Sequence, residues 1–130
     1  MTRGKLVKLL KEGKKGEALI SAGETTVEVV GSGIGGRNQE MILANLKNVK
    51  EDQILVAVGS DGHDHSDFAG ANCDTYTLKK AKEMNLDPKD YLDNNNSYFF
   101  FKQIEEGIDT GLLESNVADL LLVLTGYPKP

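Results

Sequence analysis

A glycine-rich stretch around Arg37 carries the residue types best suited to holding an anion. It reads Gly31-Ser32-Gly33-Ile34-Gly35-Gly36-Arg37-Asn38-Gln39-Glu40 and lies between an alternating apolar segment, 25–30, and a helical pattern. Glycines let the backbone approach a ligand closely, and the N–H groups and dipole at a helix start favour negative charge. The guanidinium of Arg37 matches a phosphate or carboxylate with two parallel hydrogen bonds. We therefore predict substrate or phosphate contacts from Gly33, Gly35, Gly36 and Asn38.

A second polar cluster follows the apolar run 54–58, in the acidic loop that extends from Gly59 to Asp67. Ligands of open α/β sheets bind beyond the carboxyl ends of strands, and Mg²⁺ bound to nucleotide phosphates usually takes only one or two protein carboxylates. We predict that Asp61 lies near such a Mg²⁺. The alternative, a metal ion held by the His and Asp side chains alone, fits neither zinc nor calcium-loop spacing. We interpret His63 and His65 as solvent-exposed loop residues.

Two further polar residues flank predicted strands: Glu24 in the turn 22–24, and Asn116 before the apolar segment 119–124. Glu24 and Arg37 lie in two separate glycine-containing segments, and their side chains could act on one ligand if both face the same cleft. There Arg37 would neutralise phosphoryl oxygens, and Glu24 would orient a hydroxyl group or Arg37 itself. We predict Glu24 and Arg37 as catalytic residues and Asn116 as a substrate contact. The alternatives are an exposed turn residue for Glu24 and a cap or turn for Asn116.

Gly31, Gly33 and Gly36 also have the G-x-G-x-x-G spacing of a dinucleotide-binding loop. We disfavour that interpretation because the second βαβ half of a dinucleotide fold is missing from the pattern. In addition, polar residues rather than small apolar ones open the helix after the glycines. This polar turn favours direct contact with a substrate.

The elements that must position these residues predict an α/β fold. Apolar patterns predict strands at 17–21, 25–30, 54–58 and 119–124, and helices near 36–49, 69–84, 89–92 and 97–106. The uninterrupted run 54–58 predicts a strand covered on both faces. We expect a three-layer α/β/α sandwich with a mixed sheet over 17–130, preceded by a solvated leader helix and connector over 1–16.

Composition disfavours several classes of protein. The chain has 130 residues, enough for one domain, and its net charge of −5 without a long basic block argues against nucleic acid or an anionic membrane as partner. The one cysteine, Cys73, rules out an internal disulfide. No apolar run reaches membrane-spanning length, and the N-terminal residues lack the apolar core of a signal peptide. We expect a cytoplasmic protein with a small-molecule substrate.

Five separated motifs, spread over residues 17–125, together suggest a family. They are Ala22-Gly23-Glu24-Thr25-Thr26-Val27, the glycine stretch 31–40, Ser60-Asp61-Gly62-x-Asp64, Asn96-Ser97-Tyr98-x-Phe100, and Thr110-Gly111 followed by Ser115-Asn116-Val117-x-Asp119. In order and approximate spacing they resemble the C-terminal MOFRL domain of type 2 glycerate kinases, enzymes that have also been labelled hydroxypyruvate reductases.

The resemblance implies ATP-dependent phosphorylation of D-glycerate to 2-phosphoglycerate, with ATP and Mg²⁺ as cofactors. It implies an active site in a cleft between this domain and a larger N-terminal Rossmann-like domain, which supplies a lysine. It also implies that Glu24 and Arg37 take part in activity. Three departures from the family's motifs stand out. Ala22 replaces a glycine, and the acidic loop is one residue shorter, with His65 and Ser66 in place of Gly-Pro. Residues 112–115 replace Pro-Thr-Gly-Thr and include a carboxylate, which would repel phosphate.

Three hypotheses follow. The first is a kinase domain or split subunit that is incomplete without a separate N-terminal chain or without self-association. The second is a stand-alone binding or regulatory module that keeps the anion-holding junction without the chemistry. The third is a small reductase that binds a nicotinamide cofactor, and we rank it last.

Overall fold

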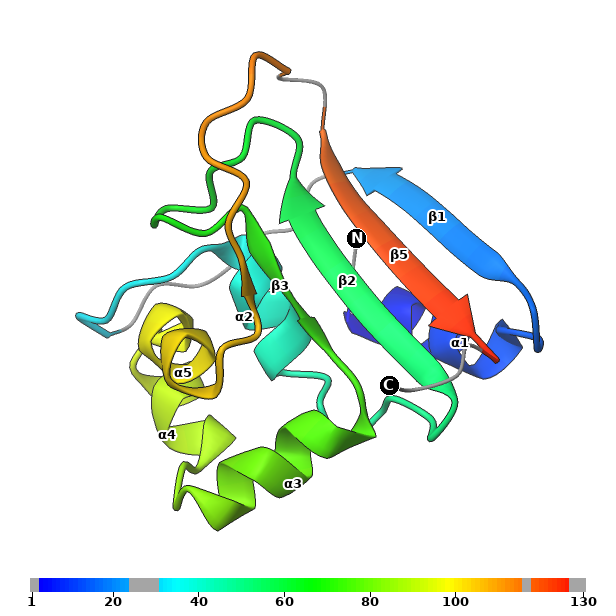
Figure 1. The fold of residues 1–130 in the computed structure, drawn as a ribbon, viewed down its shortest axis with the longest axis horizontal. Coiled ribbons are helices and arrows are strands. Elements are labelled where there is room, and N and C mark those ends of the chain that lie inside the picture. The colour runs from blue at the N-terminus through cyan, green and yellow to red at the C-terminus, as the bar shows by residue number, and fades with distance from the viewer. Residues whose placement is uncertain (1–2, 24–30, 116–117, 127–130) are drawn as a thin grey trace.

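The computed structural model describes residues 3–23, 31–115 and 118–126, which form a five-stranded sheet with its helices (Figure 1). The strands are β1 (Ala18–Gly23), β2 (Gln53–Gly59), β3 (Gly70–Cys73), β4 (Gly107–Ile108) and β5 (Asp119–Thr125). Their spatial order is β1-β5-β2-β3-β4, and every described pairing is antiparallel. The strand that comes last in the sequence therefore lies between β1 and β2.

The strands β2 and β5 are buried on one face and half-buried on the other. Along β2, Leu55 and Ala57 are buried, whereas the alternate side chains are partly exposed, and β5 shows the same alternation. Leu55 lies opposite Val123, so the buried side chains of both strands point to the same side of the sheet. The prediction that the run 54–58 is covered on both faces is therefore wrong for the part of the chain that the structure describes.

The helices lie against the buried face and beside the sheet. They are α1 (Arg3–Glu12), α2 (Arg37–Leu43), α3 (Thr75–Glu83), α4 (Pro88–Asp93) and α5 (Ser97–Ile104), and Figure 1 shows α1 and α2 behind the strands. The core joins sheet residues such as Leu55 and Val123 to Leu6, Leu10, Ile42, Leu43, Phe100 and Phe101. Because Leu6 and Leu10 are fully buried in this core, α1 is not the solvated leader helix that the sequence predicted.

Residues 69–84, predicted as one helix, instead form β3 followed by α3. The small residues of β3 carry no β-branched signal, yet they pair with β2, and a side chain at Gly70 would clash with the carbonyl group of Ala57. Asp74 then opens α3 with a capping box. Its carboxylate accepts the Tyr76 N–H (2.8 Å), and the Thr77 hydroxyl accepts the Asp74 N–H (3.1 Å).

The α/β sandwich predicted from the sequence is confirmed in its class. Two details differ among the described residues: the sheet is antiparallel rather than mixed, and helices cover one face rather than two. The antiparallel arrangement of β2 and β3 arises because β3 follows β2 through a loop and pairs with it directly, where the sequence predicted a helix. The strand predicted at 25–30 lies outside the described residues. None of the described helices is long and apolar enough to cross a bilayer.

The buried contacts of α1 lead to a stability prediction. Replacing Leu6 with Ala removes a fully buried side chain from the core, so we expect a loss of about 2–5 kcal/mol in the free energy of unfolding. Urea denaturation measures this change. Lys8→Ala in the same helix is the control, because the Lys8 side chain is 75% exposed, and it should alter stability by less than about 0.5 kcal/mol. Equal midpoints for both variants would mean that α1 is a detached leader.

Candidate functional site

Arg37 and Asp119 form the central contact of the candidate site. The guanidinium donates two hydrogen bonds to the carboxylate, from Nε to Oδ2 and from Nη2 to Oδ1 (3.2 Å). Arg37 is the first residue of α2, and Asp119 is the first residue of β5. Two parallel bonds fix the plane of a guanidinium. Arg37 is thereby held at the end of the sheet, with 35% of its side chain still exposed, whereas Asp119 is 11% exposed.

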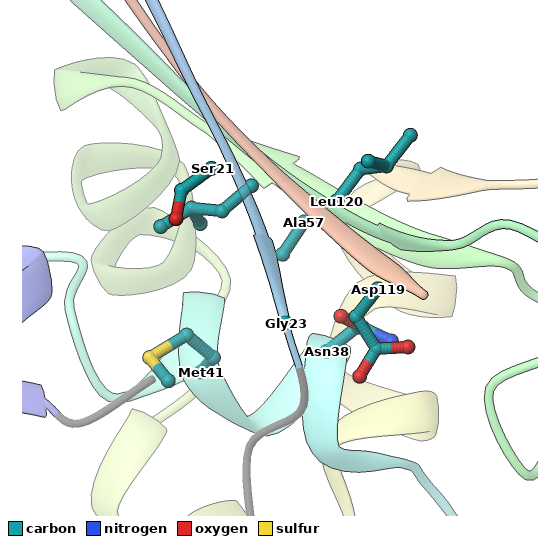
Figure 2. A pocket seen from close by; sticks show the side chains of 8 residues that line it. Ser21, Gly23, Asn38, Met41, Ala57, Asp119 and Leu120 are labelled. Atoms are coloured by element: carbon teal, nitrogen blue, oxygen red, sulfur yellow. The ribbon is translucent and has the colours of Figure 1, made fainter. Parts of the chain in front are cut away.

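A small cavity of about 20 Å³ adjoins this ion pair, between the ends of β1 and β5 and the first turns of α2 (Figure 2). Gly23, Asn38, Met41 and Asp119 are among its lining residues. Gly23 lies opposite Asp119 in the sheet, so the end of β1 meets the Arg37–Asp119 pair. A cavity of this size has room for about one water molecule, so it is not itself a substrate pocket.

The start of α2 is occupied by a carboxylate of the same chain. Asp64, which is 2% exposed, accepts the backbone N–H of Asn38 (3.1 Å) and that of Gln39 (2.8 Å). The side-chain amides of the same two residues also donate to the Asp64 carboxylate, at 3.2 Å and 3.1 Å. The negative charge that a helix start favours is therefore supplied from within the chain.

The glycine loop packs against a second segment, Asn94–Asn96, which connects α4 to α5. The N–H of Gly31 donates to Asn95 Oδ1 (2.9 Å), that of Gly33 to the Asn94 carbonyl (2.9 Å), and that of Ile34 to Asn96 Oδ1 (3.0 Å). Backbone donors that would cradle a phosphate in a nucleotide-binding loop are here paired with asparagine oxygens.

The glycines themselves are explained by close contacts within the chain. A side chain at Gly33 would clash with Asn94 and Asn96, one at Gly35 with Ser97, and one at Gly36 with Asp64. Glycine is needed at each position because another part of the protein backbone or a polar side chain approaches it. The same spacing that suggested a phosphate-binding loop thus also serves internal packing.

Asp61 lies at the same end of the sheet as the Arg37–Asp119 pair. It follows Gly59, which is opposite Asp119 in the register of β2 and β5. Its Oδ1 accepts the N–H of His63 (3.0 Å), and its carbonyl accepts the N–H of Leu113 (2.8 Å). The second bond ties the acidic loop to the loop that precedes β5.

His63 and His65 are exposed, as the sequence predicted, with ring centroids 6.1 Å apart. They line an open depression of about 720 Å³ together with Asp67, Asp109 and neighbouring residues. Within the described ranges, no three His, Cys, Asp or Glu side chains are arranged to hold a metal ion.

The structure brings three predicted site residues, Arg37, Asn38 and Asp61, to one end of the sheet. Glu24 and Asn116 lie outside the described residues. Sequence analysis missed the roles of Asp64, Asp119 and Asn94–Asn96, although each lies in or next to a quoted motif. The missing information was which distant segment each one contacts: Arg37 and Asp119 are 82 positions apart, and Gly31 and Asn95 are 64 apart.

The packing of the glycine loop predicts contrasting effects for two matched substitutions. Gly33→Ala places a methyl group against Asn94 and Asn96, so we expect a loss of about 1–3 kcal/mol in the free energy of unfolding. Gly23→Ala, at the end of β1, meets no atom within 4 Å and should leave stability unchanged or slightly higher. Urea denaturation of both variants checks this. Equal stability of the two would contradict the close approach of the loop to Asn94–Asn96.

The environment of Asp64 predicts a pH dependence. Burial raises the pKa of its carboxyl above the ordinary value, although hydrogen bonds from Gln39 and Asn38 lower it in part. Between the unfolded pKa, about 3.9, and the higher folded pKa, the folded state binds more protons, so this group's contribution to stability falls as pH rises.

Asp64→Asn does not titrate at that position and is the matched reference. The unfolding free energy of the wild type minus that of the variant should fall as pH rises from about 4, then level off above the folded pKa. Urea titrations at several pH values measure the difference. A difference that grows with pH would show that the N–H donors lower the pKa of Asp64 by more than burial raises it.

Comparison with known proteins places this geometry in a family. The model of the MOFRL family matches residues 17–119. The D-glycerate 2-kinase of Thermotoga maritima is 45% identical to this chain, over 85% of this chain and 27% of its own length. A glycerate kinase of Danio rerio is 35% identical, over 95% of this chain and 26% of its own length. A crystal structure of glycerate kinase from Thermotoga maritima has a TM-score of 0.88 at 39% identity, over 95% of this chain and 32% of that one. The chain thus spans about a quarter of the length of these curated relatives. With the family model covering most of its residues, the chain belongs to the MOFRL family.

Proposed function

We propose that this chain is the MOFRL part of a glycerate 2-kinase, which transfers a phosphoryl group from ATP to D-glycerate. The observation that carries the proposal is the guanidinium of Arg37, fixed by Asp119 at the sheet end and still one-third exposed. The relatives named glycerate kinase support it through their similarity over most of the chain. Because the chain spans only a quarter of their length, the remaining part of the enzyme must complete the cleft.

In this proposal each predicted site residue has a chemical role. Arg37 binds oxygens of the anionic substrate or of the transferring phosphoryl group, whose negative charge a fixed cation stabilises. Asp61 contributes a carboxylate near Mg²⁺ bound to ATP, an ion that needs few protein ligands. Glu24 orients the substrate hydroxyl group or Arg37, and Asn116 contacts substrate. A cytosolic location belongs to the same proposal.

The rival functions differ in what they require of the glycine loop. A nicotinamide-binding reductase needs the loop's N–H groups to face a pyrophosphate, whereas Gly31, Gly33 and Ile34 donate to Asn94–Asn96. A non-catalytic binding module is the stronger rival. It is favoured by the altered segment 112–115, in which Leu112 is 83% exposed.

Substitution of Arg37 tests the proposal. The chain is combined with the portion of the Thermotoga maritima D-glycerate 2-kinase that it does not match, and glycerate-dependent ADP formation is followed. We expect Arg37→Ala to lower kcat/KM by about 10²–10³-fold, the usual cost of removing one group that stabilises transition-state charge. Lys8→Ala removes an exposed cation in α1 and should leave the rate unchanged.

The outcomes separate the rivals. If activity survives Arg37→Ala, Arg37 does not have the proposed role of stabilising phosphoryl charge. If no activity forms but ATP, glycerate or phosphoglycerate shifts the amide signals of residues 33–38 in the isolated chain, the binding-module function replaces the kinase. Silence of those amides, together with absence of activity, excludes both.

A further inference from the structure

The carboxylate of Asp119 stands at a place in the sheet where its neighbours leave room for it. The two residues opposite it, Gly23 on β1 and Gly59 on β2, carry no side chain. Asp119 lies on the same face of β5 as the buried Leu121. It thereby reaches Arg37, the first residue of α2, and Figure 2 shows the Asp119 side chain beside the start of that helix.

The start of α2 is attached to the fold independently of Asp119. Four hydrogen bonds from Asn38 and Gln39 to the Asp64 carboxylate already hold that turn. Both bonds to Asp119 come instead from the side chain of Arg37, so what Asp119 fixes is the direction of one guanidinium. Holding a long side chain in one direction costs conformational entropy, which a partly exposed ion pair barely offsets in stability. A role in ligand binding accounts for the pair better than a role in folding.

The two bonds to Asp119 also determine which part of the guanidinium faces a ligand. A guanidinium has five N–H groups in one plane, and two of its edges each offer a pair of donors. Asp119 accepts from the edge formed by Nε and Nη2. The other edge, between Nη1 and Nη2, is therefore turned away from Asp119. An anion bound at that edge lies beyond the guanidinium carbon, about 7 Å from the Asp119 carboxylate.

We infer that Asp119 is a positioning residue: it presents the Nη1–Nη2 edge of Arg37 to the anionic ligand and, through its own charge, limits how tightly that ligand is held. The inference rests on the proposed function, in which Arg37 binds oxygens of the substrate or of the transferring phosphoryl group.

The limit on affinity follows from the repulsion between two negative charges. At a separation of about 7 Å in a solvated site, a carboxylate weakens the binding of a doubly charged phosphate by roughly three- to tenfold at low salt. Release of product limits the rate of many enzymes, so a weaker hold on a phosphorylated product favours turnover. Asp119 thus combines a fixed direction of the cation with a moderate affinity for the anion.

Titration of the full chain with inorganic phosphate, followed by NMR of the backbone amides of residues 33–38, tests the charge effect. The amide oxygen of Asp119→Asn still accepts one N–H but carries no charge. We therefore expect this variant to bind phosphate about three- to tenfold more tightly at low salt, and the difference to shrink at high salt. Asp93→Asn is the matched control, because it removes the carboxylate of an exposed ion pair with Lys89 and should leave Kd unchanged.

The unchanged chain allows a second measurement, which does not depend on the folding of a variant. Phosphate bound at the Nη1–Nη2 edge leaves the Nε–H bond to Asp119 in place. The Arg37 Nε–H signal should therefore keep its slow exchange with water while the nearby amides shift. In the ADP-formation assay, Asp119→Asn should lower kcat by about tenfold or more without raising KM for glycerate, because Arg37 is less well oriented. A residue that only stabilises the fold would not separate these two constants.

Each result decides the question. Phosphate binding by Asp119→Asn that is equal to or weaker than that of the unchanged chain overturns the inference, and so does binding that Arg37→Ala leaves intact. Loss of the Arg37 Nε–H signal on addition of phosphate overturns it as well, and this measurement decides alone if circular dichroism shows that Asp119→Asn does not fold. Tighter phosphate binding by Asp119→Asn without any ADP formation leaves the role of Asp119 in anion binding intact and refutes the kinase function instead.

Discussion

The buried carboxylate of Asp64 is the constraint on which the candidate site depends. It receives four hydrogen bonds from Asn38 and Gln39 and so attaches the first turn of α2 to the loop that follows β2. Arg37 immediately precedes those residues, and its direction toward Asp119 follows from this attachment. Loss of the carboxylate would leave several buried N–H groups without acceptors, which is costly in a closely packed environment. The position of the exposed cation is therefore set by a group that is almost fully buried.

The glycine loop illustrates how one sequence pattern serves two physical purposes. Closely spaced glycines before a helix permit any group to approach the backbone, whether a phosphate or another segment of the protein. In this fold the approaching groups are the backbone and side chains of Asn94–Asn96 and the Asp64 carboxylate. Side-chain and carbonyl oxygens occupy the positions where ligand oxygens would otherwise lie. The loop consequently supports α2 and, through it, Arg37.

Local patterns predicted the elements better than their arrangement. The apolar runs of β2 and β5 and the aromatic helix α5 were found because burial concentrates apolar residues in the local sequence. The strand β3 was missed because Gly70, Ala71 and Cys73 are small, and their strand conformation depends on pairing with β2. For the site, Arg37 and Asp61 were selected on residue type and position. Their partners could not be inferred, since ion pairs and hydrogen bonds between distant segments leave no local periodicity.

The order of strands in the sheet has a consequence for how the protein forms. β5 lies between β1 and β2, yet it is the last described strand to leave the ribosome. Until it has been synthesised, β1 has no β5 edge to join and Arg37 has no Asp119 carboxylate, so the sheet and the ion pair form only after that point. Contacts of such long sequence separation slow folding and extend the time during which apolar strands are uncovered. Completion of the described sheet therefore depends on β5, which both β1 and β2 need as a neighbour.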